Sequence, residues 1–240
     1  MHRVERCTST NDLARQLARE GAPEGTAVAA EEQTAGRGTK GRRWYSTRKK
    51  GLYVSFVLRP KTPEVSLISL AGGLAVRQAI DKACGLDTEL RWPNDLLWEG
   101  KKLAGILCET SFLGNLPEYV ILGIGVNMNH EEDDFPDDIR DIAISLKIIT
   151  QRTADLEELL RHIVVSVDEW YKLFCRGESQ AILSAYDEHS ALKKGDEITV
   201  LMNDKPAHGI YHGLDPRGAL LLKDESGIHR LTSAEIVKLL

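Results

Sequence analysis

The most informative stretch of the sequence is Gly36-Arg37-Gly38-Thr39-Lys40-Gly41-Arg42-Arg43-Trp44. Its glycines allow the backbone to turn and to approach a ligand closely. Seven basic residues and no acid lie between Arg37 and Lys50, although the whole chain carries a net charge of -5. This local positive charge suits a polyphosphate or carboxylate ligand, and a solvated basic loop is the plainer alternative.

The stretch is neither of the common glycine-rich nucleotide motifs. The pattern GxxxxGK[ST] is absent from it. Its spacing Gly36-x-Gly38-x-x-Gly41 matches the dinucleotide fingerprint only in outline, because a polar Arg42-Arg43 pair and then a strand follow where a helix is required. We therefore expect a different kind of anion-binding loop.

Outward from this stretch, the hydrophobic pattern predicts an α+β fold. Helices are expected over residues 11–20, 66–84 and 155–174. Strands are expected over residues 26–33, 52–58, 89–92, 96–98, 103–109 and 119–126. Strands and helices do not alternate strictly, and several neighbouring strands look hairpin-linked. A mixed or antiparallel sheet is therefore favoured over a doubly wound parallel one.

The pattern changes near Lys193, which predicts a second domain. Short alternating runs follow over residues 198–202, 207–213, 219–222 and 228–231. Turns separate them, the first at Asn203-Asp204. This spacing is typical of a small β-barrel. We expect a larger domain over residues 1–188 and a small barrel domain over residues 189–240.

Composition argues against several classes of protein. The 240-residue chain is 42% hydrophobic and 28% charged, as globular proteins are. Its four cysteines are scattered, without a CxxC pair or a nearby histidine cluster, which speaks against a disulfide framework or zinc site and fits a reducing cytosol. No signal-peptide core opens the chain, and no run reaches the roughly 18 apolar residues of a membrane span. We expect a cytoplasmic protein that does not bind membranes.

Four further segments carry polar or glycine residues beyond those that a plain fold needs. They are Arg91-Trp92-Pro93-Asn94-Asp95-Leu96, Lys101-Lys102-Leu103-Ala104-Gly105-Ile106-Leu107, Gly123-Ile124-Gly125-Val126-Asn127-Met128-Asn129 and Ser9-Thr10-Asn11-Asp12. Taken singly, the first, second and fourth have ordinary explanations as a proline turn, a surface lysine and a helix N-cap. Glycines inside an apolar strand mark a close approach by another group.

Taken together and in this order, the five segments resemble those of the biotin protein ligases. The series is STN, GRG-x-x-GR-x-W, WPND, K-x-x-GIL and GIG-x-N, and it covers nearly the whole chain. The resemblance implies a catalytic domain related to class II aminoacyl-tRNA synthetases and an SH3-like C-terminal domain. It also implies ATP-dependent attachment of biotin to a specific lysine of a biotin carboxyl carrier protein through biotinyl-5'-adenylate, with Mg²⁺ assisting.

The resemblance assigns roles to individual residues. Lys102 and Arg37 would be catalytic. Biotin would be bound by Ser9, Thr10, Asn11, Gln33, Arg37, Gly38, Thr39, Lys102 and Gly105. ATP and the adenylate would be bound by Arg37, Trp44, Asn94, Asp95, Lys102 and Asn127. The ligands of the metal are not assigned.

The chemistry fits these residue types. A carboxylate attacks the α-phosphate of ATP, so two anions must be brought together, and fixed positive charge lowers the cost of doing so. The biotin ureido group suits the short donors and acceptors of Ser, Thr, Asn and Gln. The second step needs no protein nucleophile, because the lysine amine of the carrier attacks a mixed anhydride.

The sequence departs from the family pattern at two positions. Thr39 stands where the family usually has arginine, and Arg91 where lysine is common. If the loop is extended, the side chain of Lys40 points away from that of Thr39 and is a poor substitute for the arginine. We therefore expect weaker retention of the adenylate than is usual for the family.

Several alternatives stay open. A lipoate or octanoate ligase of the same superfamily and a non-catalytic biotin sensor are the rival functions. Some members carry an N-terminal helix-turn-helix domain, but this chain begins almost at once with Ser9-Thr10-Asn11, so we expect no DNA binding. A homodimer is a further alternative, because the family often dimerises through the catalytic sheet.

Overall fold

The computed structural model describes residues 1–202 and 205–239, so the turn expected at Asn203-Asp204 lies outside the described residues. A seven-stranded sheet in the order β1-β2-β3-β7-β6-β5-β4 forms its larger part. The strands are β1 (His2–Cys7), β2 (Ala27–Gln33), β3 (Gly51–Leu58), β4 (Glu89–Arg91), β5 (Asp95–Trp98), β6 (Lys101–Leu113) and β7 (Leu116–Asn127). β1 and β2 are parallel, and the other neighbours are antiparallel. The expected mixed sheet is confirmed.

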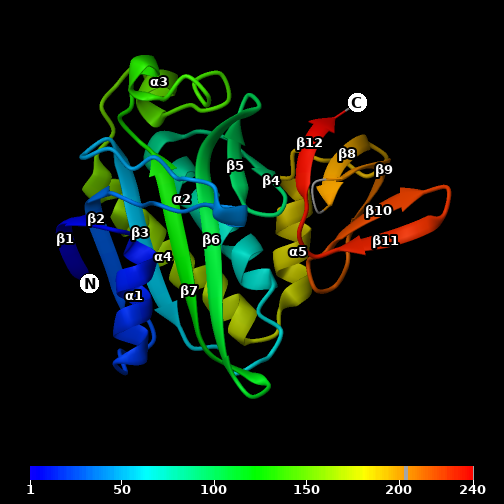
Figure 1. Cartoon of the computed structure of the whole chain (residues 1–240), viewed down its shortest axis with the longest axis horizontal. Helices are drawn as coiled ribbons and strands as arrows, with labels where there is room; N and C mark the ends of the chain where they lie inside the picture. Colours follow the sequence, from blue (N-terminus) through cyan, green and yellow to red (C-terminus); the bar gives the residue numbers. More distant parts are fainter. Residues whose placement is uncertain (203–204, 240) are drawn as a thin grey trace.

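Helices cover both faces of this sheet (Figure 1). The long helices α2 (Leu67–Cys84) and α4 (Leu156–Cys175) pack on one face, and the short α1 (Thr10–Arg19) packs on the other. β3 serves both sides, because successive side chains of a strand point to opposite faces. Phe56 belongs to the core beside α2, and Val57 belongs to the cluster beside α1.

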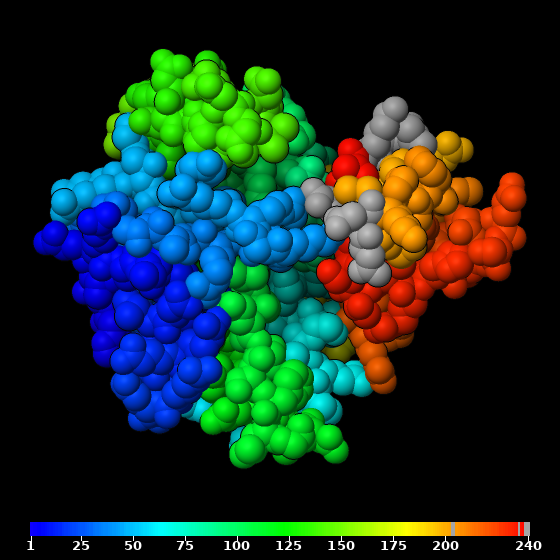
Figure 2. All heavy atoms as spheres, in the orientation of Figure 1, coloured from blue at the N-terminus to red at the C-terminus, as the bar shows by residue number. Residues whose placement is uncertain are grey.

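A second sheet forms the C-terminal part (Figure 1), whose orange and red atoms lie to one side of the larger part in the space-filling view (Figure 2). Its five antiparallel strands are β8 (Glu197–Met202), β9 (Lys205–Leu214), β10 (Leu220–Asp224), β11 (Gly227–Leu231) and β12 (Glu235–Leu239). The indole Nε1 of Trp92 donates a hydrogen bond of 2.9 Å to the carbonyl of Gly218, which joins this part to the turn between β4 and β5. A separate C-terminal β-structure is thus confirmed, while the boundary between residues 188 and 189 stays a prediction.

Some elements were not expected from the sequence. They are β1, α3 (Leu146–Thr150), α5 (Ser179–Glu188) and β12. β1 is an edge strand in which no residue is fully buried, so it lacks the apolar alternation that marks a half-buried strand. α3 has only five residues, too few for a periodic pattern. Within the described part of the chain, no helix combines the length and apolar character that crossing a membrane requires.

His130 lies buried in the segment between β7 and α3. Its side chain is 1% exposed, and its ring stacks on that of Phe135 with the ring centroids 5.0 Å apart. Neither ring nitrogen has a hydrogen-bond partner among the described residues. Burial lowers the pKa of His130 to about 4, against an opposing effect of Asp134. The imidazole is therefore neutral at pH 7.

This burial predicts a loss of stability in acid. The unfolded chain takes up a proton on this histidine near its ordinary pKa of 6.5, whereas the folded chain resists protonation down to about pH 4. The free energy of unfolding should fall by roughly 3 kcal/mol as the pH drops through that window. Urea unfolding between pH 7 and 4 measures it. The variant His130→Leu should lose this component, while His212→Leu, at an exposed position of β9, should retain it. An unchanged pH dependence in His130→Leu would contradict the prediction.

Candidate active site

Three glycines form the floor of a cavity on the α1 side of the large sheet. Gly105 of β6 pairs with Gly125 of β7, and Gly123 lies two residues before Gly125 on the same face. The intervening Ile106 and Ile124 point the other way, into the core. Because these glycines carry no side chain, other groups approach the sheet closely here, and the cavity opens beside them.

Ten of the thirteen residues expected at the site line this cavity. They are Ser9, Thr10, Asn11, Gln33, Arg37, Gly38, Trp44, Asn94, Lys102 and Gly105. Asn94 also lines an adjacent cleft, together with Thr39 and Asp95, at the border of the C-terminal sheet. Asn127 is 5% exposed, and its amide donates to the backbone carbonyls of Lys102 and Ile144, at 3.3 and 3.1 Å. In this structure it therefore ties two segments together behind the cavity.

The N-terminal end of α1 supplies the short polar groups of the cavity. Ser9 occupies the N-cap position, but its side chain makes no capping hydrogen bond. Gln33 Oε1 accepts hydrogen bonds from the Thr10 amide and hydroxyl at 2.8 and 3.1 Å. The Ser55 hydroxyl lies 2.7 Å from Thr10 Oγ1 and 2.6 Å from Asn11 Oδ1. These bonds fix the polar side chains before any ligand arrives.

Trp44 lies across the glycine floor. A Cβ atom on Gly125 would lie 2.6 Å from its ring, and one on Gly105 would lie 3.1 Å from it. Its indole Nε1 is buried and has no hydrogen-bond partner among the described residues. Trp44, which the resemblance assigns to ATP and the adenylate, thus has its ring on the sheet.

Lys102 brings a positive charge to the same cavity. Its Nζ lies 5.5 Å from the centroid of the Trp44 ring and 2.5 Å from Oδ1 of Asp95. Arg91 contacts the other oxygen of this carboxylate at 2.9 Å. Burial alone would raise the pKa of Asp95, but Lys102 and Arg91 together hold it below its ordinary value. Asp95 is therefore ionised, with two cations on it.

Comparison with known proteins agrees with this geometry. The model of the biotin/lipoate A/B protein ligase family matches residues 3–127, just over half of the chain, and that of the biotin protein ligase C-terminal domain matches residues 195–239. The chain belongs to the biotin protein ligase family. The family resemblance of the five sequence segments is thereby confirmed.

Relatives of the same family match over nearly the whole chain. The biotin–[acetyl-CoA-carboxylase] ligase of Paracoccus denitrificans is 32% identical over 239 residues, which are 97% of this chain and 98% of that protein. The bifunctional ligase/repressor BirA of Bacillus subtilis is 36% identical over 95% of this chain and 71% of that protein. The solved biotin protein ligase of Aquifex aeolicus, in complex with biotin and ATP, superimposes with a TM-score of 0.84 at 31% identity, covering 98% of this chain and 96% of that one.

The loop that carries the family signature GRG-x-x-GR-x-W is not extended at its tip. Thr39–Gly41 forms a 3-10 turn with Lys40 at a φ of 56°. The expectation that Lys40 points away from Thr39 because the chain is extended therefore does not apply. Arg42 lies beside Thr39, with Nη2 3.3 Å from its hydroxyl oxygen. A cation thus adjoins the position where the biotin protein ligases usually have arginine.

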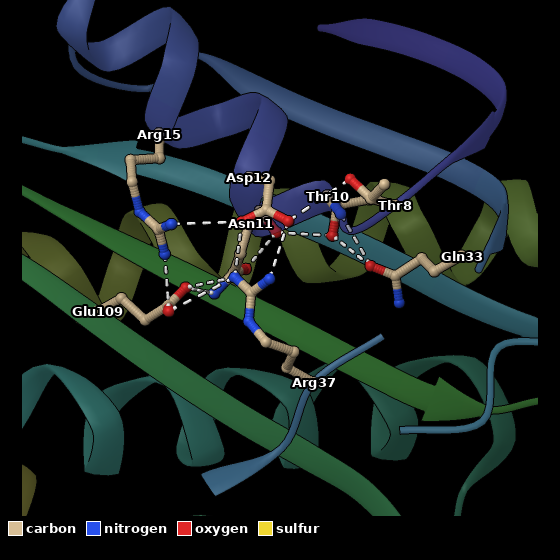
Figure 3. A network of polar contacts seen from close by, with 9 residues as sticks. Thr8, Thr10, Asn11, Asp12, Arg15, Gln33, Arg37 and Glu109 are labelled. Carbon is tan, nitrogen blue, oxygen red and sulfur yellow. Dashed lines mark hydrogen bonds and ion pairs between the residues drawn. The ribbon is translucent and has the colours of Figure 1, made fainter. Parts of the chain in front are cut away.

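The sequence did not reveal a group of charged residues beside the cavity. Asp12 of α1 and Glu109 of β6 contact the guanidinium of Arg37, and Arg15 of α1 contacts both of these carboxylates (Figure 3). One signal for Glu109 was present, because it lies four residues after Gly105 on the same strand and so faces the same side. The partners of Arg37 are distant in sequence, and no local pattern reveals them.

The glycine floor gives a test that is independent of any ligand. A Cβ atom on Gly123 would lie 2.2 Å from Oδ1 of Asn11, so Gly123→Ala should push Asn11 away from Ser55. Such overpacking should cost about 1–3 kcal/mol of unfolding free energy in urea. Gly38→Ala is the control, because its added Cβ would meet nothing closer than 3.6 Å and should change stability by less than about 0.5 kcal/mol. Equal stabilities for the two variants would contradict the close packing of α1 on the floor.

Proposed function

We propose that this chain is a ligase that attaches biotin to a lysine of a biotin carboxyl carrier protein, using ATP and a biotinyl-5'-adenylate intermediate. One observation carries the proposal: ten of the expected site residues line one cavity, and they include both the polar end of α1 and the cation Lys102. Membership of the biotin protein ligase family supports it, as does the Aquifex aeolicus relative, whose structure holds biotin and ATP.

The two ends of the cavity suit the two ends of biotin. Thr10, Asn11 and Gln33 present hydroxyl and amide groups, which match the donors and acceptors of a ureido ring. Lys102 presents an ammonium, which matches a carboxylate and a phosphate. Between these ends lies the glycine floor, which the ring of Trp44 covers, so the apolar chain of biotin would run along this ring. This polarity favours biotin over lipoate, whose dithiolane ring has no amide to pair.

In the first step a carboxylate oxygen of biotin bonds to the α-phosphorus of ATP, and the bond to pyrophosphate breaks. Both reactants are anions, so the fixed charge of Lys102 stabilises the transition state. In the second step the amine of the carrier lysine attacks the carbonyl carbon of the mixed anhydride. An amide forms, the amine loses a proton, and AMP leaves. This step requires no nucleophile from the chain itself.

The residues present do not make a protein cage for Mg²⁺. Among the described residues that line the two cavities, Asp95 is the only carboxylate, and it already contacts Lys102 and Arg91. Mg²⁺ commonly binds through substrate phosphates with only one or two carboxylates. We propose that the ion arrives on the nucleotide, where it neutralises phosphate charge, with Asp95 as the protein ligand available to it.

The decisive experiment is incubation with biotin, ATP, Mg²⁺ and a biotin carboxyl carrier domain, followed by mass analysis of the acceptor lysine. Calorimetric titration with biotin and with lipoate separates the two ligases. Biotin-dependent exchange of pyrophosphate into ATP separates an enzyme from a biotin sensor. That the chain does not bind DNA stays a prediction, and the homodimer stays an open alternative.

Replacing Lys102 tests its role in adenylation. Lys102→Ala should lower the rate of biotin-dependent pyrophosphate exchange about a hundredfold, because removing a fixed charge at a reacting phosphate costs roughly 3 kcal/mol. Lys101→Ala is the matched control: its side chain is exposed, and the exchange rate should stay near that of the parent. A near-normal rate in Lys102→Ala would show that this lysine is only a partner of Asp95.

Restoring arginine at position 39 tests how the adenylate is retained. A charge-assisted hydrogen bond contributes about 1 kcal/mol more than a neutral one, so Thr39→Arg should slow adenylate release several-fold in stopped-flow displacement. Biotin affinity should change little. Thr34→Arg adds the same charge at an exposed site of the loop and should leave release unchanged. Unaltered release in Thr39→Arg would indicate that Arg42, which already contacts Thr39, does the work of the missing arginine.

A further inference from the structure

Three segments that are distant in sequence meet at the guanidinium of Arg37 (Figure 3). Its Nη1 and Nη2 donate to the two carboxylate oxygens of Asp12 on α1, each at 2.8 Å. Nη2 also lies 3.4 Å from Oε2 of Glu109 on β6. A two-pronged arginine–carboxylate pair fixes orientation as well as distance. The geometry therefore holds the arginine in one place beside the cavity.

Shielding makes this pair stronger than an ordinary surface ion pair. The side chains of Arg37 and Asp12 are each 33% exposed, and that of Glu109 is 28% exposed. The hydrogen bonds that Arg37 donates to Asp12 lower the pKa of Asp12 and raise the pKa of Arg37. Both groups are thus charged throughout the physiological range. Exposed ion pairs contribute little to stability, whereas partly buried, bidentate pairs contribute more.

The backbone around Arg37 transmits this restraint to the rest of the loop. The Gly38 amide donates to the carbonyl of Arg42 at 2.7 Å, and the Trp44 amide donates to that of Gly36 at 2.9 Å. Residues 36–44 therefore form a small hairpin, with Arg37 bridged to Arg43. Two side chains of this hairpin reach the body of the domain beside the cavity: Arg37 at Asp12, and Trp44 on the glycine floor.

The hairpin depends on carboxylates from elsewhere. The segment from Arg37 to Lys50 has seven basic residues and no acid, so its own charges repel one another. Asp12 and Glu109 supply opposite charge at the side of the cavity. Glu109 is shared, because it also accepts from Asn11 at 2.6 Å and contacts Arg15 at 2.7 Å. Asp12 also contacts Arg15, at 3.2 Å, but it accepts two hydrogen bonds of 2.8 Å from Arg37 and is therefore the principal partner of Arg37.

From these contacts we propose that Asp12 and Glu109 are positioning residues, which hold Arg37 and with it the hairpin 36–44 closed over the ligand cavity. Arg37 then acts as the latch of the loop and does not bind the phosphate. The proposal rests on the proposed biotin ligase function, because the ligand retained under the hairpin is biotin or its adenylate. It extends that function by naming what keeps the intermediate in place.

The variants are chosen so that charge alone changes. Asp12→Asn keeps the shape of the side chain and removes its charge, which weakens its contact with Arg15 as well as with Arg37. Glu109→Gln alters a partner of both Asn11 and Arg15 and is the second choice. Arg37→Gln and the double variant that combines it with Asp12→Asn complete a double-mutant cycle. The matched control is Arg48→Gln: Arg48 lies in the same loop and pairs with Glu31 at 3.0 Å, but its side chain is 52% exposed and it does not line the cavity.

The first measurement needs no ligand. Hydrogen exchange of the peptide 36–46 reports the amides of Gly38 and Trp44, which are bonded only while the hairpin is formed. Asp12→Asn should speed this exchange about tenfold, and Arg48→Gln should leave it unchanged. Parental exchange in Asp12→Asn would overturn the latch, whether or not the protein binds biotin.

The second measurement separates a latch from a phosphate ligand. Release of biotinyl-5'-adenylate should be about five- to tenfold faster than in the parent in both Asp12→Asn and Arg37→Gln. The double variant should release it no faster than either single variant, because both changes break the same contact. The rate at which the adenylate forms from biotin and ATP should fall by the same factor in both single variants. If Arg37→Gln slows adenylation strongly while Asp12→Asn leaves it intact, Arg37 binds the phosphate and the latch is wrong. If the parent itself forms no adenylate, the proposed function fails, and the exchange result alone decides the latch.

Discussion

The alternation of side chains along the β6–β7 hairpin is the constraint on which the site depends. On one face Ile106 and Leu122 pack against α2, and on the other Gly105 and Gly125 form a flat floor on which the Trp44 ring lies. The same strands thus build the core and the binding surface. Because the side-chain period is two, a shift of register by one residue would place isoleucine in the cavity and glycine in the core. The apolar face therefore specifies the floor of the site.

Sequence pattern predicted the elements whose burial repeats regularly, and it failed where burial does not repeat. The helix over residues 66–84 and the strand over residues 52–58 were confirmed nearly to the residue. The edge strand β1 was missed because its charged residues face solvent. At the site, motifs placed ten residues around one cavity, but a motif does not give the side on which a loop residue lies. Thr39 accordingly lines the neighbouring cleft, and Asn127 lies behind the floor.

The carboxylates that contact Arg37 could not be predicted from local sequence pattern, for a physical reason. Asp12 and Glu109 are separated by about half of the larger domain in sequence, and each by itself resembles a solvated surface charge. Only the packing of α1 against the sheet brings both to Arg37. An excess of one sign of charge in a loop is nevertheless a usable signal. A run of basic residues that folds against the body of a protein requires carboxylates there, and acids on strands beside glycines are the first candidates.

Each cation that lines the cavity shares its carboxylate with a second cation outside the cavity lining. Asp95 is held by Lys102 and by Arg91, and Asp12 is held by Arg37 and by Arg15. Breaking a partly buried pair is costly mainly because it leaves an unpaired charge. Here the second cation remains when the first turns to a ligand or when the loop opens. Lys102 or Arg37 can therefore leave its carboxylate without stranding an ionised group. The same pairing is compatible both with the proposed latch and with the entry of an anionic substrate.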